Sequence, residues 1–105
     1  MPAGPPTLFR WSDIALDRVT EMVSRKEIRA DRESLVQTYF KKGAVVPVHE
    51  HTGTQWVYVL QGVLRMTIGG EAVTAREGDV IHVPAGVPHQ AEALDDTFVL
   101  DIRRS

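Results

Sequence analysis

From Ser34 onward, short runs rich in β-branched residues alternate with turn residues along the chain. Gln61-Gly62 and Gly69-Gly70 mark tight connections between such runs. Short strands separated by regular turn signals are typical of an all-β barrel or sandwich. The pattern therefore predicts strands over residues 34–40, 45–50, 55–61, 63–68, 71–76, 80–83, 88–93 and 96–103.

Alternation within these strands predicts which face is buried, because successive side chains of a strand point to opposite faces. Leu64, Met66 and Ile68 alternate with Arg65 and Thr67, so we expect their face to belong to the core. A second set with the same alternation lies near the end of the chain and is expected to repeat this arrangement: Phe98, Leu100 and Ile102.

The N-terminal part has a different character from the rest of the chain. Residues 1–7 are rich in proline, and residues 11–23 could form either a short helical turn or a loop before the first strand begins at Val23. We therefore expect a partly flexible arm and loop over residues 1–22 and one barrel domain over residues 23–105. A chain of 105 residues is long enough for one core and too short for two.

Composition narrows the classes of function. A net charge of −2 with 25% charged residues gives no basic surface for nucleic acid or for a membrane. The chain has no cysteine, which excludes disulfides and thiolate metal sites. The first residues show no signal-peptide pattern, and no apolar run approaches the ~20 residues of a membrane span. We expect a cytoplasmic protein.

Three histidines and a glutamine have the spacing of one metal site. His49 and His51 would share a strand face, Gln55 follows a short Thr-Gly-Thr break, and His89 comes from a separate strand after a proline-containing turn. Neutral imidazole suits divalent first-row ions such as Zn, Fe, Ni, Mn or Co, and an amide oxygen adds a weak, uncharged ligand. The alternatives are histidines satisfied by ordinary hydrogen bonds, and a Gln55 that contacts a metal-bound water.

The segments Gly43 to Gly62 and Gly78 to Ala93 resemble the two sequence motifs of the cupin superfamily in their glycines, prolines and histidines. The resemblance implies a double-sheet jelly-roll barrel with a ligand at its mouth. Two positions depart from the motifs. Gln55 stands where the family has glutamate, and Ala93 stands where it has asparagine.

A narrower resemblance is to the small cupins of the pectin and alginate pathways, which open unsaturated uronates into linear keto sugars. It is carried by residues 23–26, 40–45, 59–62 and 67–69, and by the His-x-His-x3-Gln55 pattern. The resemblance implies a divalent metal held by His49, His51, Gln55 and His89. In those proteins a segment after the last strand supplies the proton-transfer group. This chain ends at Ser105 without that segment, so another residue would do the proton work or the substrate differs.

Further polar residues are candidates for the wall of the pocket, and Tyr39 and Asp101 are also candidates for the general acid or base: Gln37, Tyr39, Asp101 and Arg103. By strand parity, Glu50, Arg65 and His82 should point away from the core. Trp56 and Tyr58 share the face opposite Gln55 and form an apolar stripe. Such a stripe suggests an interface, and we expect a homodimer.

Three functions are compatible with these observations. The first is a metal-dependent isomerase or lyase that uses the ion as a Lewis acid on a small polar, anionic substrate, because neutral ligands leave the ion's charge uncompensated. The second is a metal-dependent dioxygenase, which would contain iron and consume oxygen. The third is a cupin that binds a small molecule without turnover.

Overall fold

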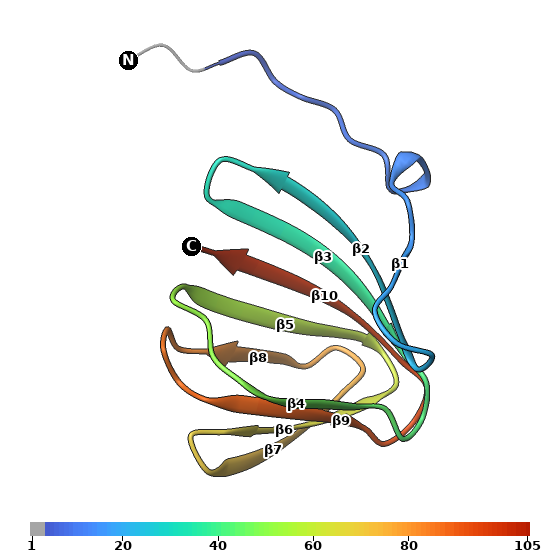
Figure 1. Ribbon diagram of the computed structural model, residues 1–105, viewed down its shortest axis with the longest axis vertical. Helices are drawn as coiled ribbons and strands as arrows, with labels where there is room; N and C mark the ends of the chain where they lie inside the picture. Colours follow the sequence, from blue (N-terminus) through green and yellow to red (C-terminus); the bar gives the residue numbers. More distant parts are fainter. Residues whose placement is uncertain (1–3) are drawn as a thin grey trace.

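The computed structural model describes residues 4–105, which form strands and one helical turn (Figure 1). The elements are η1 (Trp11–Asp13), β1 (Asp17–Arg18), β2 (Val23–Ala30), β3 (Glu33–Phe40), β4 (Val45–His49), β5 (Thr54–Gln61), β6 (Val63–Ile68), β7 (Glu71–Arg76), β8 (Val80–Val83), β9 (His89–Ala93) and β10 (Thr97–Arg104). The all-β prediction is confirmed, and every predicted strand from β3 to β10 agrees to within one residue at each end.

The strands form two antiparallel sheets that face each other. The large sheet has the order β1-β2-β3-β10-β5-β8, and the small sheet has the order β4-β9-β6-β7. Some neighbours in each sheet are far apart in the chain, since β10 lies between β3 and β5 and β9 lies between β4 and β6. In Figure 1 the turn between β2 and β3, the loops after β4 and β8, and the end of β10 gather at one end of the sandwich.

The core lies between the sheets. Its most buried side chains are Val36, Val57, Val59, Leu64, Val83 and Val99. Burial of each such side chain contributes about 1.5–3 kcal/mol of stability. The predicted face of β6 is confirmed, because Leu64 and Met66 are buried and Ile68 packs against the same cluster.

The predicted face of β10 is wrong. Thr97, Val99 and Asp101 are buried, whereas Ile102 is 37% exposed and Phe98 and Leu100 are only half-buried. The Thr97 hydroxyl donates to the Val63 carbonyl at 3.1 Å and accepts from the Val63 amide at 3.1 Å. These bonds compensate the burial of a polar residue at the start of the strand, so Thr97 faces inward together with Val99 and Asp101.

Residues 4–22 contain little regular structure, namely η1 and the two-residue strand β1. Residues 1–3 of the expected flexible arm lie outside the described part of the chain. The helical turn allowed by the sequence is η1, whose Trp11 carbonyl accepts a hydrogen bond from Lys26 Nζ at 2.9 Å. No helix in residues 4–105 is long and apolar enough to cross a membrane.

Candidate metal centre

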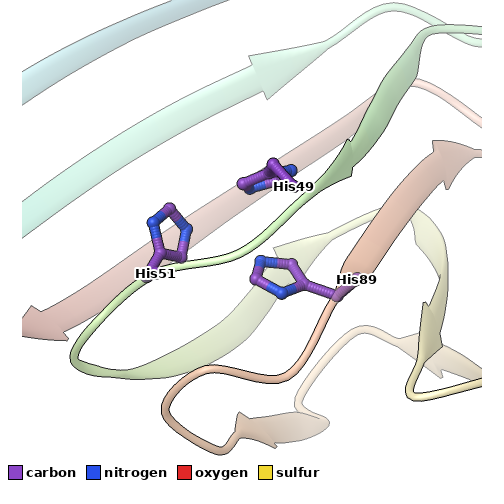
Figure 2. A group of neighbouring side chains, drawn as sticks. All are labelled: His49, His51 and His89. Carbon is purple, nitrogen blue, oxygen red and sulfur yellow. The ribbon is translucent and has the colours of Figure 1, made fainter.

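Three histidine side chains converge between the sheets, at the end where the β4–β5 and β8–β9 loops lie (Figure 2). His49 is the last residue of β4 and pairs with His89, the first residue of β9, while His51 follows in the loop. The ring centroids of His49 lie 4.3 Å from those of His89 and 4.8 Å from those of His51. The candidate ligand atoms of the three residues all lie within 4.8 Å of one another.

Backbone carbonyls determine which ring nitrogens face the shared space. His49 Nδ1 lies 2.9 Å from the Pro47 carbonyl oxygen, and His89 Nδ1 lies 2.9 Å from the Val87 carbonyl oxygen. Because a carbonyl only accepts, each Nδ1 must carry the proton in the neutral ring, which leaves Nε2 with a free lone pair. This is the outer contact that orients a histidine ligand toward a metal.

Gln55, near the start of β5, lies in the same cavity as the three histidines and is 5% exposed. Its amide forms a hydrogen bond with the Asp101 carboxylate, and its Oε1 is buried with no hydrogen-bond partner in residues 4–105. The Nε2 atoms of His51 and His89 are buried and unpartnered in the same way. Buried acceptors without a donor are costly, and a divalent cation would satisfy all of them. The described residues therefore fit a metal.

The surroundings of His51 and His89 favour the neutral form of these two imidazoles. Burial lowers the pKa of His51 to about 4, with further lowering by the charges of Arg103, His49 and His89. Burial also lowers the pKa of His89, and the hydrogen bond to Val87 opposes this effect only in part. A histidine must be deprotonated to bind a metal, so these rings are ready to do so at neutral pH.

The three histidines line a cavity of about 230 Å³ between the sheets, hereafter the inner cavity. Much of its wall is apolar, from core residues such as Val57, Leu64 and Met66. Three ionisable side chains on the large sheet also line it: Arg25, Asp101 and Arg103. Burial raises the pKa of the Asp101 carboxyl, although the nearby Arg103 charge and the Gln55 hydrogen bond pull it down.

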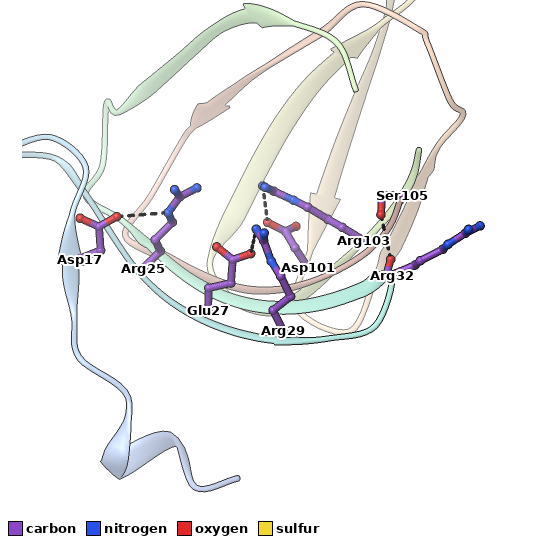
Figure 3. Close-up of polar contacts among 8 residues, drawn as sticks. All are labelled: Asp17, Arg25, Glu27, Arg29, Arg32, Asp101, Arg103 and Ser105. Carbon is purple, nitrogen blue, oxygen red and sulfur yellow. Dashed lines mark hydrogen bonds and ion pairs between the residues drawn. The ribbon is translucent and has the colours of Figure 1, made fainter. Parts of the chain in front are cut away.

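A second cavity of about 440 Å³, hereafter the outer cavity, adjoins the inner one. It lies among the β2–β3 turn, the β4–β5 loop and the end of β10. His51 and Arg103 line both cavities, so they mark the junction. The rest of the outer wall is polar, with both signs of charge, and an ion pair joins Arg29 Nη2 to Glu27 Oε2 at 2.9 Å (Figure 3).

Two polar candidates from the sequence do not reach the inner cavity. Tyr39 is 51% exposed, and its ring stacks on Phe98 at 4.1 Å on the outer face of the large sheet. Gln37 has the same parity as Tyr39 on β3, whereas Val36, Thr38 and Phe40 face inward. The prediction that Tyr39 and Gln37 form the pocket wall is therefore wrong, and Tyr39 is unsuitable as the acid or base.

The prediction that Glu50, Arg65 and His82 point away from the core is confirmed, because all three residues are exposed. Glu50 contributes to the outer cavity. His82 packs against Trp56, with ring centroids 4.4 Å apart. None of these three residues lines the inner cavity.

Sequence reasoning missed Arg25 and Thr38 as cavity residues. Arg25 lies on β2 with the parity of the buried Val23, and it pairs with Thr38 on β3. The available signal was that Arg25 lies two positions from Val23. Residues two apart in a strand share a face, so Arg25 faces inward together with Val23. Arg25 Nε also lies 3.5 Å from Asp17 Oδ2 (Figure 3).

The sequence matches the cupin domain family over residues 36–102, and the protein therefore belongs to the cupin family. KdgF from Halomonas sp. has a structure with a TM-score of 0.86 and 27% identity, covering 95% of this chain and 94% of KdgF. A structure of Bacillus subtilis oxalate decarboxylase with Mn(II) centres has a TM-score of 0.83 and 25% identity, covering 98% of this chain and 31% of that one. The jelly-roll prediction is thereby confirmed.

Two curated relatives come from Bacillus subtilis (strain 168). Oxalate decarboxylase OxdC is 33% identical over 66 residues, which cover 58% of this chain and 17% of OxdC. Quercetin 2,3-dioxygenase is 41% identical over 49 residues, which cover 46% of this chain and 14% of the dioxygenase. The matches thus span only a small part of these relatives. Together with the three-histidine cluster, the comparisons support a cupin with a site for a divalent metal.

Proposed function

We propose that this cupin is a metal-dependent enzyme of the isomerase or lyase type that acts on a small, polar, anionic substrate. The observation that carries the proposal is a set of buried polar atoms without a hydrogen-bond partner in residues 4–105, His51 Nε2, His89 Nε2 and Gln55 Oε1, beside the buried carboxyl of Asp101. His49, His51, His89 and Gln55 would hold the ion. When bound to these uncharged ligands, a divalent ion supplies Lewis-acid polarisation of a carbonyl, hydroxyl or carboxylate.

Asp101 is the residue that would move the proton. Its carboxyl lies in the inner cavity, and burial raises its pKa above the ordinary value of a carboxyl, which favours the protonated form that a general acid needs. The Gln55 amide and Arg103 contact the carboxyl and fix its orientation. Asp101 would therefore give a proton to, or take one from, a substrate atom held in the inner cavity.

Uronate-like acids are the substrate class that we favour. The His-x-His-x3-Gln55 pattern resembles the pectin- and alginate-pathway cupins, and the likeness to KdgF extends over nearly the whole of both chains. The arginines of the inner cavity are consistent with an anionic substrate, because they add positive charge beside the candidate metal ligands.

An assay of the metal-loaded protein with unsaturated uronates, followed by the ultraviolet absorbance of their double bond, tests this proposal. We expect turnover, and we expect Asp101→Asn to lower kcat by roughly 10²-fold or more while metal content is unchanged. Asp95→Asn, at an exposed position, is the matched control. Full activity of Asp101→Asn would exclude Asp101 as the acid or base. Binding of uronates without turnover would favour the non-catalytic alternative.

A metal-dependent dioxygenase is the second candidate, because the quercetin 2,3-dioxygenase match has the higher identity of the two curated relatives. Gln55 weighs against it, since a carboxylate ligand usually helps to stabilise higher-valent iron. The two candidates differ in their requirements. The dioxygenase would contain iron and would consume oxygen with its substrate, whereas the isomerase would turn over equally in the absence of oxygen.

A further inference from the structure

We infer that Arg103 is a specificity-determining residue that binds the carboxylate of the substrate at the junction of the two cavities, while the outer cavity holds the hydroxylated remainder of the same molecule. The ligand class is a hydroxylated carboxylic acid, such as a sugar acid. This inference rests on the proposed function, because it describes the substrate of the same site.

The position of Arg103 is the first support. Arg103 on β10 pairs with Gln55 on β5, so their side chains are direct neighbours on the inward face of the large sheet. Arg103 lines both cavities, and its charge contributes to the lowered pKa of His51. A carboxylate bound to this guanidinium would therefore lie beside the candidate metal ligands.

The donor inventory of Arg103 is the second support. A guanidinium has five N–H donors in a planar fork. Among the described residues, Arg103 has one acidic partner, with Nη2 3.5 Å from Asp101 Oδ2, and its Nε is buried without a hydrogen-bond partner (Figure 3). Asp101 thus holds the guanidinium in place from one side and leaves further donors for a second carboxylate, which arginine binds in a bidentate manner.

The contrast between the two cavities is the third support. The inner cavity of about 230 Å³ has a largely apolar wall, whereas the outer cavity of about 440 Å³ includes Ser34, Thr52 and Thr54 among its lining residues. The charged groups of the outer wall are of both signs, and Arg29 is already paired with Glu27. Such a wall suits neutral hydroxyl groups, so a single anionic head with a hydroxylated tail matches the pair of cavities.

Calorimetric titration with two probes, acetate and D-galacturonate, tests the inference on metal-loaded protein of measured metal content. We expect wild-type protein to bind D-galacturonate more tightly than acetate. Arg103→Met should weaken D-galacturonate binding about tenfold or more without loss of metal, as expected for loss of a charge-assisted contact. Arg103→Lys should restore part of the affinity, and Arg65→Met, at an exposed position on the small sheet, should have no effect.

A second variant examines the outer cavity. Thr52 lines this cavity only and lies in the exposed β4–β5 loop, so Thr52→Trp should fill space there without disturbing the core. We expect it to weaken D-galacturonate binding and to leave acetate binding unchanged. Equal D-galacturonate affinity in Arg103→Met and wild type, or in Thr52→Trp and wild type, would overturn the inference. A wild-type protein that takes up no metal would instead refute the proposed function, and Arg103-dependent binding could still be measured in it.

Discussion

Single hydrogen bonds determine which ring nitrogen carries the proton in His49 and His89. The carbonyls of Pro47 and Val87 accept the Nδ1 protons of His49 and His89, so the Nε2 lone pairs are presented to the same space. The convergence of the three histidines could be predicted from the sequence, but the expected shared strand face of His49 and His51 could not hold, because β4 ends at His49 and His51 lies in the following loop. The tautomers could not be predicted, since they depend on carbonyls whose direction only the folded loops define.

Protonation of His51 should make the stability of the metal-free protein depend on pH. The pKa of His51 is about 4 in the folded protein, below its ordinary value of 6.5, so the unfolded chain binds the proton more tightly. Stability should therefore fall as pH drops from about 6.5 to about 4, and should not change on this account above 6.5. Asp101 acts in the opposite sense, because its raised pKa gives stability at low pH that is lost as pH rises.

The contribution of His51 can be isolated by comparing denaturant unfolding of wild type and His51→Gln, in chelator, across this pH range. The variant should lose less stability on acidification than wild type, because it lacks the group whose proton the unfolded state prefers. Parallel pH curves for the two proteins would contradict the account.

An irregularity in strand β4 helps to position the candidate ligand His49. In β4, which lies at the edge of the small sheet, the pairing with β9 shifts between Val46 and His49. Pro47 falls within this irregular stretch, where its missing N–H costs no ladder bond. A bulge of this kind re-aims neighbouring side chains, and here the carbonyl of Pro47 accepts from His49.

Gly53 allows the β4–β5 loop, which carries His51, to lie directly against the end of β10. A Cβ at Gly53 would collide with the backbone carbonyl of Arg104. Gly53→Ala should therefore displace the loop, cost about 1–3 kcal/mol of stability and weaken metal binding. Thermal unfolding and a metal-competition titration measure the two effects.

Gly70→Ala is the matched control for this variant. Gly70 lies in the turn between β6 and β7 at φ +88° with open space around its Cα, so alanine should cost ~1–2 kcal/mol from backbone strain alone. Metal affinity should be unchanged in this control. A Gly53→Ala protein that binds metal as tightly as wild type would show that the loop does not position His51.

The β10 strand shows where sequence reasoning fails. Period-two alternation favours the apolar set Phe98, Leu100 and Ile102 as the buried face, but the strand has apolar contacts on its outer face too. Leu100 pairs with Tyr58, and Ile102 pairs with Trp56. Asp101 and Arg103 face inward and belong to the candidate site. The expectation that the apolar set is buried therefore fails at the residues for which we propose a functional role.

The outer face of the large sheet carries exposed apolar side chains that indicate how two protein molecules associate. Its exposed apolar side chains are Leu35, Tyr39, Trp56, Tyr58, Val80 and Ile102. Ile102 pairs with Leu35 on one side and Trp56 on the other, so the patch is continuous across three strands. We propose that a second copy of the chain covers this face in a two-fold dimer, because a continuous exposed apolar patch is typical of an interface and two-fold homodimers are the commonest oligomers.

Light scattering coupled to size-exclusion chromatography tests the dimer. Wild type should be a dimer at micromolar concentration, and Trp56→Glu should be a folded monomer, because the charge would be buried without a partner in the interface. Val48→Glu is the control, since Val48 is 63% exposed on the small sheet. A wild-type monomer, or a Trp56→Glu dimer, would contradict this arrangement.

Both sheets and the loops at one end of the sandwich contribute to the candidate metal site. Elemental analysis of protein purified without a polyhistidine tag tests this site most directly, with His51→Ala and Gln55→Ala alongside. We predict close to one divalent ion per chain in wild type, of Zn, Ni, Mn, Fe or Co, loss of the ion in His51→Ala, and weaker retention in Gln55→Ala. Wild-type protein that contains no metal and takes up none on reconstitution would contradict the metal site.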